Sequence, residues 1–478
     1  MPSHREFPNE LWLQILSNVP KDNFPAVSLT NNTLCQLVRP LLYTLLDFHP
    51  YAHYEKTLLF PPSEEVDRSM KRLHFWRSDE IAPFVRSIEI SPWAAESVPW
   101  SAWHAVDSPY ILQDLLFAHL QSFTCLQRLS TRHINFTGTA ISSLARMSAL
   151  QHLSIEDCDV VAGGDLDLFR QTLALSSVTV KFGLYYMDVS ADVLPRGYTL
   201  RPWLPLLHPD HLLELHLACD IRTWSENPSA VPDFPNVRRL FIHLSPIYEI
   251  NRNFEILSKF RNVEVLTIPS QMGKYYAFHP QDSELPVLPA LKELTCPWGY
   301  LPIARRAALT HLSITIFYTS GQLMTQLERL RNPTSITSLV LLGVQPLDDT
   351  ALVTILTLCL GLVEIRLSFP KDTTGKAASL YKALLRTPSL PPTLKSLCFC
   401  EWEHEFDESH PGTLLGSEFQ EIRAALVSRC PALTSLWLSG PGFAFHWRKY
   451  ADQTIEESAE ELQPRKTFTD FNEFWRTR

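Results

Sequence analysis

The sequence predicts an α/β solenoid, and three observations support this fold class. A six-residue pattern of the form L-x-x-L-x-L recurs along most of the chain, with clear copies at residues 150–155 and 336–341. Two runs of copies are almost evenly spaced. Four copies begin at positions 212, 237, 263 and 291, which lie 25, 26 and 28 residues apart, and three begin at 309, 336 and 362, which lie 27 and 26 residues apart. Apolar residues at helical spacing follow several of the copies. This pattern and period are typical of leucine-rich repeats, whose units are roughly 20–29 residues long.

Each copy is expected to form one strand of a parallel sheet. Side chains alternate between the two faces of a strand, so the second and third apolar positions of a copy point into a common core. A single repeat cannot bury its apolar face alone, and stacked neighbours bury it jointly in a curved array with its strands on the concave side. The clearest copies begin at residues 150, 237, 263, 291, 309, 336, 362, 394 and 433, weaker ones begin at 85 and 126, and a further strand is expected near Val178–Val180.

Helices are expected between successive strands, near residues 141–147, 323–330, 352–356, 380–384 and 419–426. The chain is expected to divide into a helical module at 1–46, a linker with irregular first repeats at 47–110, a repeat array at 111–445 and a C-terminal cap or tail at 446–478. The linker includes an insertion rich in Trp and Pro at 91–110, and the tail is aromatic at 468–475.

Composition narrows the class of protein. The 478 residues are 45% hydrophobic, and their formal net charge is −9 without any run of lysines or arginines, so nucleic acid is not an expected partner. Nine cysteines show no paired spacing, and neither an apolar signal segment nor a stretch of about 18 apolar residues is present. These features predict a cytoplasmic or nuclear location away from membranes. A repeated unit builds a binding surface, which favours recognition over catalysis.

Residues 7–46 have a different pattern, which predicts three short helices. The first is expected to use Asn9 as its N-cap, the second to span residues 24–29, and the third to begin near residue 33 and to kink or restart at Pro40. Three helices in about 40 residues rarely form a stable domain alone and need another surface to cover their apolar faces. The apolar stripe of the first helix consists of Leu11, Ile15, Leu16 and Val19.

This segment resembles an F-box, a motif usually written L-P-x-E-[LI]-x-x-x-I-[LF]. Phe7 stands where the motif usually has its first Leu. Residues 39–43 and 81–90 also resemble the lead-in of fungal families of F-box proteins with irregular leucine-rich repeats. The residues that match the F-box are Pro8, Glu10, Leu11, Ile15, Leu16, Val19, Leu29, Leu37 and Val38.

The resemblance implies partners and a function. An F-box docks on a Skp-type adaptor, which links it to the cullin scaffold of a ubiquitin ligase, and the repeat array would then hold a target protein. The alternative is that the helices only cap the array, and that the protein is a leucine-rich-repeat scaffold or inhibitor acting outside any ubiquitin ligase. The residues expected to contact the adaptor are Phe7, Pro8, Leu11, Ile15, Leu16 and Leu29.

The outward-facing strand positions supply candidate contacts to the target protein. They are rich in Arg, His and aromatic residues, and Arg and aromatic side chains contribute much of the energy at protein interfaces. The candidates are Arg128, Arg132, His152, Arg239, Phe241, His311, Arg366 and Trp437.

No segment predicts catalysis or a bound cofactor. Residues 370–377 are similar to a phosphate loop in their setting, but Pro370 and Ala377 stand where that motif requires Gly and Ser or Thr. The motifs G-x-S-x-G, H-E-x-x-H and G-x-G-x-x-G do not occur. One cluster has side chains that suit zinc, without a second Cys pair, so free thiols are expected and zinc is the alternative. That cluster consists of Cys398, Cys400, His404 and His410.

Overall fold

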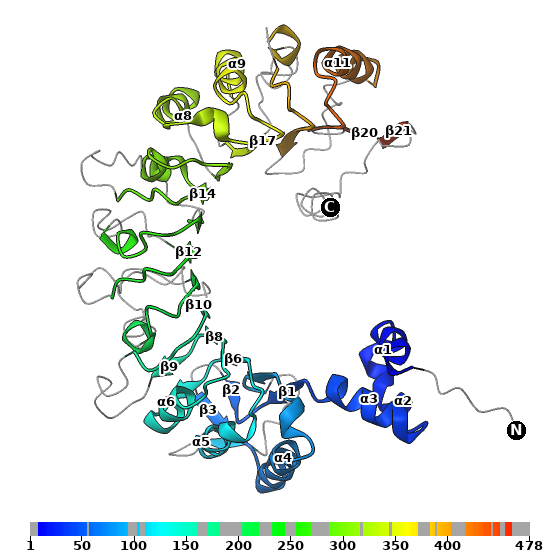
Figure 1. The fold of residues 1–478 in the computed structure, drawn as a ribbon, viewed down its shortest axis with the longest axis vertical. Coiled ribbons are helices and arrows are strands. Elements are labelled where there is room, and N and C mark those ends of the chain that lie inside the picture. The colour runs from blue at the N-terminus through cyan, green and yellow to red at the C-terminus, as the bar shows by residue number, and fades with distance from the viewer. Residues whose placement is uncertain are drawn as a thin grey trace, which may run out of the picture. The chain divides into compact units, whose positions relative to one another are not determined.

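The computed structural model divides the chain into two compact units, Met1–Asn236 (unit 1) and Val237–Arg478 (unit 2). Each unit contains a run of mainly parallel strands with helices or short 3-10 turns between them (Figure 1). The structure describes residues 8–54, 57–93, 103–105, 110–160, 171–181, 203–218, 232–243, 255–269, 286–315, 319–343, 347–370, 383–387, 390–402, 416–440, 443–449 and 455–460.

Unit 1 begins with three short helices around a small core, in the predicted order. Leu16, Phe24 and Val38 are buried in this core, one from each helix. The prediction that Asn9 caps the first helix is wrong, because Asn9 is the first helical residue and Pro8 is the N-cap. The segments are α1 (Asn9–Ser17), η1 (Lys21–Asn23), α2 (Phe24–Ser28) and α3 (Asn32–Leu42).

The third helix is capped by a side chain and continues through its proline. The Asn31 Oδ1 accepts a hydrogen bond from the Leu34 N–H at 2.8 Å, which satisfies one of the unpaired donors of the first turn. Pro40 lies inside α3, and the helix continues to Leu42, so the predicted restart does not occur. The Thr44 hydroxyl donates to the Pro40 carbonyl just beyond the end of the helix.

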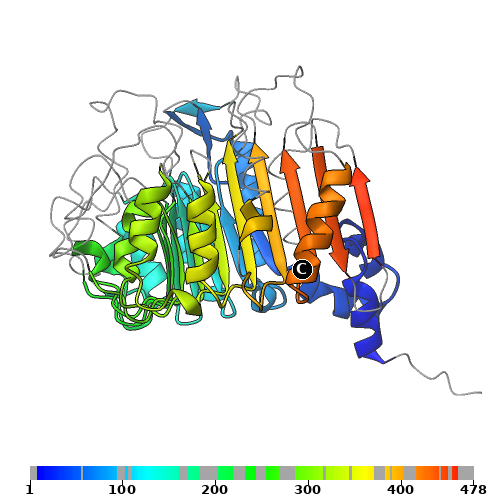
Figure 2. The same ribbon diagram turned by 90° about the horizontal axis from the view of Figure 1, so that it is seen from above.

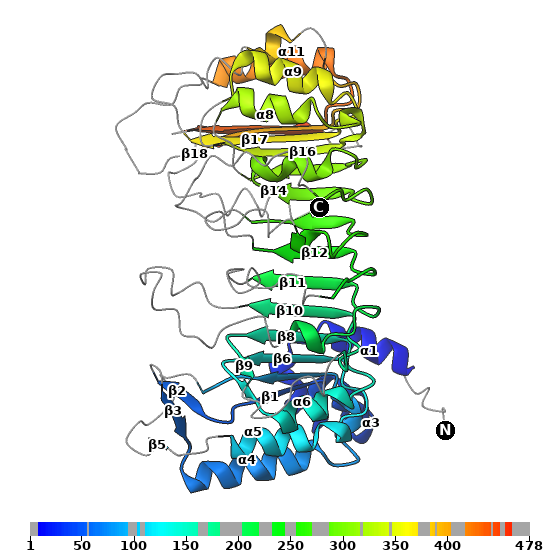
Figure 3. The same cartoon turned by 90° about the vertical axis from the view of Figure 1, so that its left-hand side faces the viewer.

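Six strands of unit 1 pair in parallel and in chain order, and their middle members lie side by side (Figure 3). The strand predicted near residues 178–180 is present as β10 (Ser177–Lys181). Neighbouring strands are in register, so that Leu129, Leu153 and Val178 are direct neighbours. The strands are β1 (Leu45–Phe48), β4 (Ser87–Ile90), β6 (Arg128–Arg132), β8 (His152–Glu156), β10 (Ser177–Lys181) and β11 (Glu214–Ala218).

Smaller elements of unit 1 lie between these strands. Three short strands form a separate antiparallel sheet, β2 (Ala52–Tyr54), β3 (Thr57–Phe60) and β5 (His104–Ala105), and two more form a parallel pair, β7 (Asn135–Phe136) and β9 (Asp159–Val160). The helices are α4 (Ser63–Trp76), α5 (Ile111–Ala118) and α6 (Gly138–Ala145), with 3-10 turns η2 (Ala82–Phe84), η5 (Leu120–Ser122) and η8 (Leu204–Leu206).

One repeat of unit 1 extends the pattern beyond its six-residue copy. The longer form of a leucine-rich repeat places Asn or Cys three residues after the last apolar position of the strand. Cys158 occupies this position in the copy at 150–155, and its thiol accepts a hydrogen bond from the Ile134 N–H of the preceding repeat at 3.3 Å. This buried cysteine therefore satisfies a backbone donor between repeats, a role that its scattered spacing in the sequence did not indicate.

The described residues of unit 2 include eight parallel strands, and each of them corresponds to a predicted copy. Its helices lie on one face of the sheet, and Figure 2 shows the later strands side by side behind them. The strands are β12 (Arg239–Ile242), β13 (Val265–Thr267), β14 (Glu293–Cys296), β15 (His311–Ile314), β16 (Ser338–Leu342), β17 (Glu364–Pro370), β18 (Ser396–Trp402) and β19 (Ser435–Gly440). The helical segments are residues 255–257, η11 (Trp298–Ala304), α8 (Ser320–Leu327), η12 (Pro333–Ser335), α9 (Asp349–Leu358), residues 383–386 and α11 (Gly416–Arg429), and they include the predicted helices.

The sheet of unit 2 ends in two antiparallel strands, β20 (Phe443–Lys449) and β21 (Ile455–Glu460). Trp447 pairs with Leu436 of β19 and is 3% exposed, so β20 continues the buried face of the last parallel strand. The predicted tail beyond residue 460 lies outside the described residues. Across the described part of the chain, every helix is too short or too polar to cross a lipid bilayer.

The alternation of strand side chains generates a stability prediction. Leu153 is buried between Leu129 and Val178, so Leu153→Ala should lower the free energy of unfolding of unit 1 by about 2–5 kcal/mol, measured by urea denaturation. The neighbouring Ser154 side chain points to the other face, so Ser154→Ala should change the free energy of unfolding by less than about 0.5 kcal/mol. Equal losses in both variants would contradict the register, because a one-residue slip exchanges the two faces.

A second prediction concerns the N-cap of α9. The Asp348 Oδ1 accepts the Ala351 N–H at 2.7 Å, so Asp348→Ala should lower the local stability of α9 by about 1 kcal/mol at pH 7. Burial alone raises the pKa of Asp348, but hydrogen bonds from Thr350, Ala351 and Ser320 outweigh it, and the pKa lies below its ordinary value.

Because the folded-state pKa of Asp348 is the lower one, its stabilisation is present above the unfolded pKa of about 3.9 and is lost as the pH falls through the folded value. Hydrogen exchange of the α9 amides should therefore show a difference between wild type and Asp348→Ala that shrinks below about pH 4. Asp348→Asn is the matched control, since Asn caps as well without titrating. A difference that persists at low pH would mean that the carboxylate is not the cap.

Candidate binding surfaces

The strands of unit 1 present alternate side chains on the face opposite the core, which we call the open face. Leu129, Leu153 and Val178 point into the core, so the residues on either side of each point outward. Three predicted target contacts, Arg128, Arg132 and His152, lie on this face. Arg128 and His152 are direct neighbours on β6 and β8, so the structure brings these two together.

One ion pair crosses the open face of unit 1. The Arg132 Nε lies 3.2 Å from the Glu156 Oε1, and the two side chains are 55% and 38% exposed. An exposed pair of this kind stabilises the fold by about 0–1 kcal/mol, so the pair is easily exchanged for a contact to a partner. Lys181, two strands away from Arg132 in the same row, was missing from the sequence-based set, because the 62-residue interval between the copies at 150 and 212 hid the register of β10.

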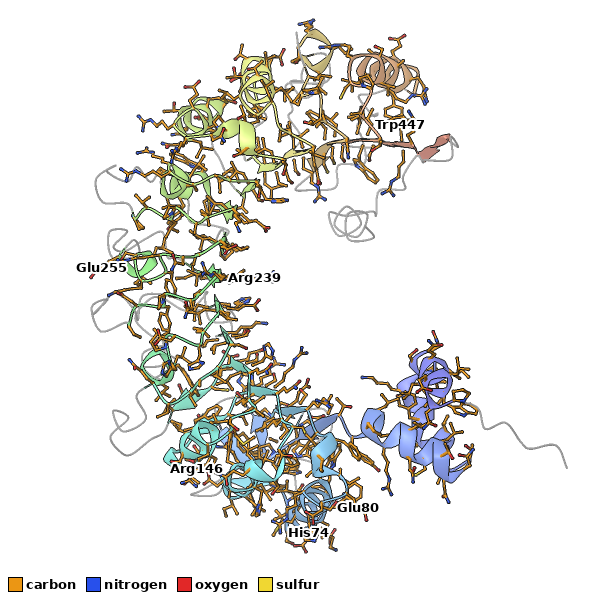
Figure 4. The ribbon with its side chains drawn as sticks, viewed as in Figure 1. His74, Glu80, Arg146, Arg239, Glu255 and Trp447 are labelled. Carbon is orange, nitrogen blue, oxygen red and sulfur yellow. The ribbon has the colours of Figure 1, made fainter. Side chains whose placement is uncertain are left out.

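The first strands of unit 2 also place predicted contacts on an open face. Arg239 and Phe241 lie on β12. Figure 4 shows Arg239 on the strand side of the ribbon of unit 2 and Glu255 on the opposite, helical side. The rings of Phe241 and His243 have centroids 5.4 Å apart. His311 on β15 is exposed, and its Nδ1 lies 3.9 Å from the Glu293 Oε1.

The last strands of unit 2 are more enclosed than predicted. Arg366 is 17% exposed, and its Nε lies 3.5 Å from the Glu364 Oε1, while Trp437 is partly buried. Cys398 occupies an outward position of its six-residue copy but is completely buried, because the register places it between these two large side chains on β17 and β19. Ser396 and Ser435 also occupy outward positions of their copies, and both are buried.

The zinc alternative has little support from the described residues. Burial raises the pKa of the Cys398 thiol well above its ordinary value, which opposes the thiolate that zinc requires. His404 and His410 lie outside the described residues. Within the described ranges, no group of three or more His, Cys, Asp or Glu side chains is arranged to hold a metal ion.

The helical module presents an apolar surface. Leu11 and Ile15 are both almost half exposed, Leu29 is 86% exposed, and Pro8 is exposed as well. Leu16, another predicted adaptor contact, is only 2% exposed and belongs to the core of the module, while Phe7 lies outside the described residues. Leu13 was not predicted, and it is as exposed as Ile15. Leu13 lies outside the predicted apolar stripe of the first helix, and this position in the sequence could have indicated that it is exposed.

Comparison with known proteins adds little to this description. No family model matches the chain, and no curated protein matches it. A solved structure of an internalin (InlF) from Listeria monocytogenes is similar to 67% of this chain and 83% of its own, with 11% sequence identity and a TM-score of 0.33. A TM-score of this size is too low to argue from. The assignment of an α/β repeat solenoid therefore rests on the strands of this chain and on their register.

The burial of the cysteines predicts their reactivity. Burial raises the pKa of Cys158 to about 12 and also keeps Cys398 in the thiol form, so neither should react with iodoacetamide at pH 8 in the native protein. Cys35, Cys125 and Cys400 are partly exposed and should be labelled first, as measured by peptide mass spectrometry. Labelling in urea, where all thiols should react, is the control. Rapid native labelling of Cys398 would show that the face between β17 and β19 is open.

Proposed function

We propose that this protein is the substrate-recognition subunit of a Skp–cullin–F-box type ubiquitin ligase. In this proposal the helices α1 to α3 dock on a Skp-type adaptor, and the open strand face binds the target protein. The protein itself performs no chemistry. It raises the effective concentration of the target near the ubiquitin-conjugating enzyme.

The observation that carries the proposal is the concentration of exposed apolar side chains on the helical module. Twelve large hydrophobic side chains are exposed among the described residues, and five of them lie in α1 to α3 or the turn after α2. Single exposed apolar residues are normal, but a group on one small module marks an interaction site. The five residues are Leu11, Leu13, Ile15, Leu29 and Leu41.

The core of the module explains why these side chains remain outside. Leu16, Phe24 and Val38 fill the centre, so α1 buries a single residue and leaves most of its surface to other contacts. A partner that covers Leu11, Ile15 and Leu29 would remove their apolar surface from water. This burial would contribute a favourable binding free energy of roughly 25 cal/mol per Å². This gain supports docking on an adaptor without any change in the core.

A second candidate function is a repeat scaffold or inhibitor that acts outside a ubiquitin ligase. The favouring observation is that the module also packs against the repeats that follow it. The Tyr43 ring makes edge contacts with Phe75 and Trp76 at centroid distances of 5.6 and 5.4 Å, and the Arg39 Nη1 lies 3.5 Å from the Glu80 Oε2. The helices would then serve as the cap that a repeat array needs at its end.

Co-purification with the Skp-type adaptor of the host organism distinguishes the two candidates. Wild type should form a stoichiometric complex, and the triple variant Leu11→Ser/Ile15→Ser/Leu29→Ser should weaken it by about 100-fold, since each lost apolar contact contributes about 1 kcal/mol or more. Circular dichroism should be unchanged, because none of the three side chains belongs to the core.

The control is Met70→Ser/Leu360→Ser, which removes two apolar side chains outside the module that are about as exposed as Leu11 and Ile15, and it should leave adaptor binding unchanged. If wild type does not bind the adaptor, the ligase proposal is wrong and the repeat-scaffold candidate is favoured. Equal binding by the triple variant would place the adaptor on a different surface.

A further inference from the structure

A row of short hydroxyl side chains crosses the open face of unit 1. Ser130, Ser154 and Thr179 are direct neighbours on β6, β8 and β10, and each occupies the middle outward position of its strand. All three are partly exposed. We call these three residues the hydroxyl row.

The hydroxyl row differs from other hydroxyls of the same repeats in its hydrogen bonds. The Thr131 Oγ1 donates to the Ser154 carbonyl at 3.2 Å, and the Ser176 Oγ donates to the Gln151 carbonyl at 3.0 Å, so both are used inside the fold. Among the described residues, by contrast, no hydrogen bond involves the side chain of Ser130, Ser154 or Thr179. Each of these hydroxyls can therefore donate to and accept from a bound molecule.

Longer and mainly basic side chains stand on both sides of the hydroxyl row. Two residues earlier on the strands lie Arg128, His152 and Ser177, and two residues later lie Arg132, Glu156 and Lys181. Glu156 is engaged by Arg132, whereas Arg128 and Lys181 are exposed and form no ion pair with any other described residue. These nine positions thus carry three fixed positive charges and one negative charge on a chain whose net charge is −9.

Acidic residues border this basic region. Glu89 on β4 is in register with Ser130, and Glu214 on β11 is in register with Ser177. An anionic ligand is therefore favoured only across the width of β6, β8 and β10. Because strands are about 4.8 Å apart, the hydroxyl row spans roughly 10 Å from Ser130 to Thr179.

We infer that the hydroxyl row and its flanking cations bind an extended, acidic peptide segment of a partner protein. A polyproline II chain completes one turn of three residues in roughly 9 Å, so it presents equivalent groups at nearly the spacing of every second strand. Such a chain has no internal hydrogen bonds, which leaves its N–H and C=O groups for the hydroxyls. Arg128 and Lys181 select acidic side chains at the two ends of the row. This inference rests on the proposed role of the open face in target binding.

Unit 2 provides an internal comparison. Thr267, Thr295 and Ser313 form an equivalent row on β13, β14 and β15. Their neighbours two residues earlier are Val265, Glu293 and His311, which lack the two unpaired cations of unit 1. A short side chain in the middle position could serve only to relieve crowding between strands, and this explanation applies to both rows. Selective binding of an acidic peptide applies to the row of unit 1 alone.

The test uses the full chain and fluorescence anisotropy of a labelled peptide of repeated Glu-Ala-Pro units, which carries one Glu on the same side of every polyproline II turn (the Glu–Pro peptide). A peptide of repeated Gln-Ala-Pro units of the same length (the Gln–Pro peptide) is the neutral comparison. The Glu–Pro peptide should bind saturably and about tenfold more tightly than the Gln–Pro peptide. Arg128→Gln/Lys181→Gln should remove this preference. Ser154→Gln, which fills the middle of the row, should weaken binding of both peptides by about fivefold or more, without a change in thermal stability.

Two control variants are matched to these changes. Arg146→Gln removes an exposed cation at the end of α6, and Figure 4 shows Arg146 on the helical side of unit 1. Thr295→Gln adds the same side chain to the row of unit 2. Both should leave the affinity for the Glu–Pro peptide unchanged.

Three results would overturn the inference. They are failure of the Glu–Pro peptide to bind more tightly than the Gln–Pro peptide, equal loss of affinity in Ser154→Gln and Thr295→Gln, and equally tight binding of a thymidine oligonucleotide of similar length. A loss of stability in Ser154→Gln with unchanged binding would support the crowding explanation instead. Adaptor capture by wild type is measured in parallel, so failure of the peptide and failure of the ligase proposal remain distinguishable.

Discussion

The open faces of both units depend on the in-register pairing of parallel strands whose side chains alternate between two faces. A shift of one residue on any strand would carry its leucines to the open face and its polar residues into the core. The apolar neighbours Leu129, Leu153 and Val178 oppose such a shift, because each fully buried side chain stabilises the correct register by roughly 1.5–3 kcal/mol.

Hydroxyl groups at the starts of strands reinforce this register. The Ser176 hydroxyl donates to the Gln151 carbonyl of the preceding repeat, and in unit 2 the Thr337 and Thr434 hydroxyls donate to the carbonyls of Thr310 and Lys395. These three bonds link a repeat to the one before it, so the strands are held together where they begin as well as in the core. In the described part of unit 1, the hydroxyls in the middle of the open face make no such bonds between repeats and are available to a partner.

The helical module and the repeats differ in how much of their apolar surface they bury. Its three helices are too short to bury much surface among themselves, so a few core residues hold them together and several apolar side chains remain in water. Among the described residues, the repeats bury most of their large apolar side chains and carry charges and hydroxyls on the open strand faces. The chain thus combines an apolar surface on the module with polar open faces on the repeats, which suits two partners of different chemistry.

The sequence by itself determined the repeat architecture, because a leucine pattern with a period of 25 to 28 residues has few other ways to bury its apolar side chains. It also predicted the three N-terminal helices and most outward positions, since both follow from local spacing. Only the tertiary structure decided that Leu16 belongs to the core while Leu29 is exposed, because both are apolar residues of the same motif and differ only in their neighbours. The burial of Cys398 and the alignment of Lys181 with Arg132 likewise depend on side chains from neighbouring strands, and contacts between strands are not encoded in the local pattern of either strand.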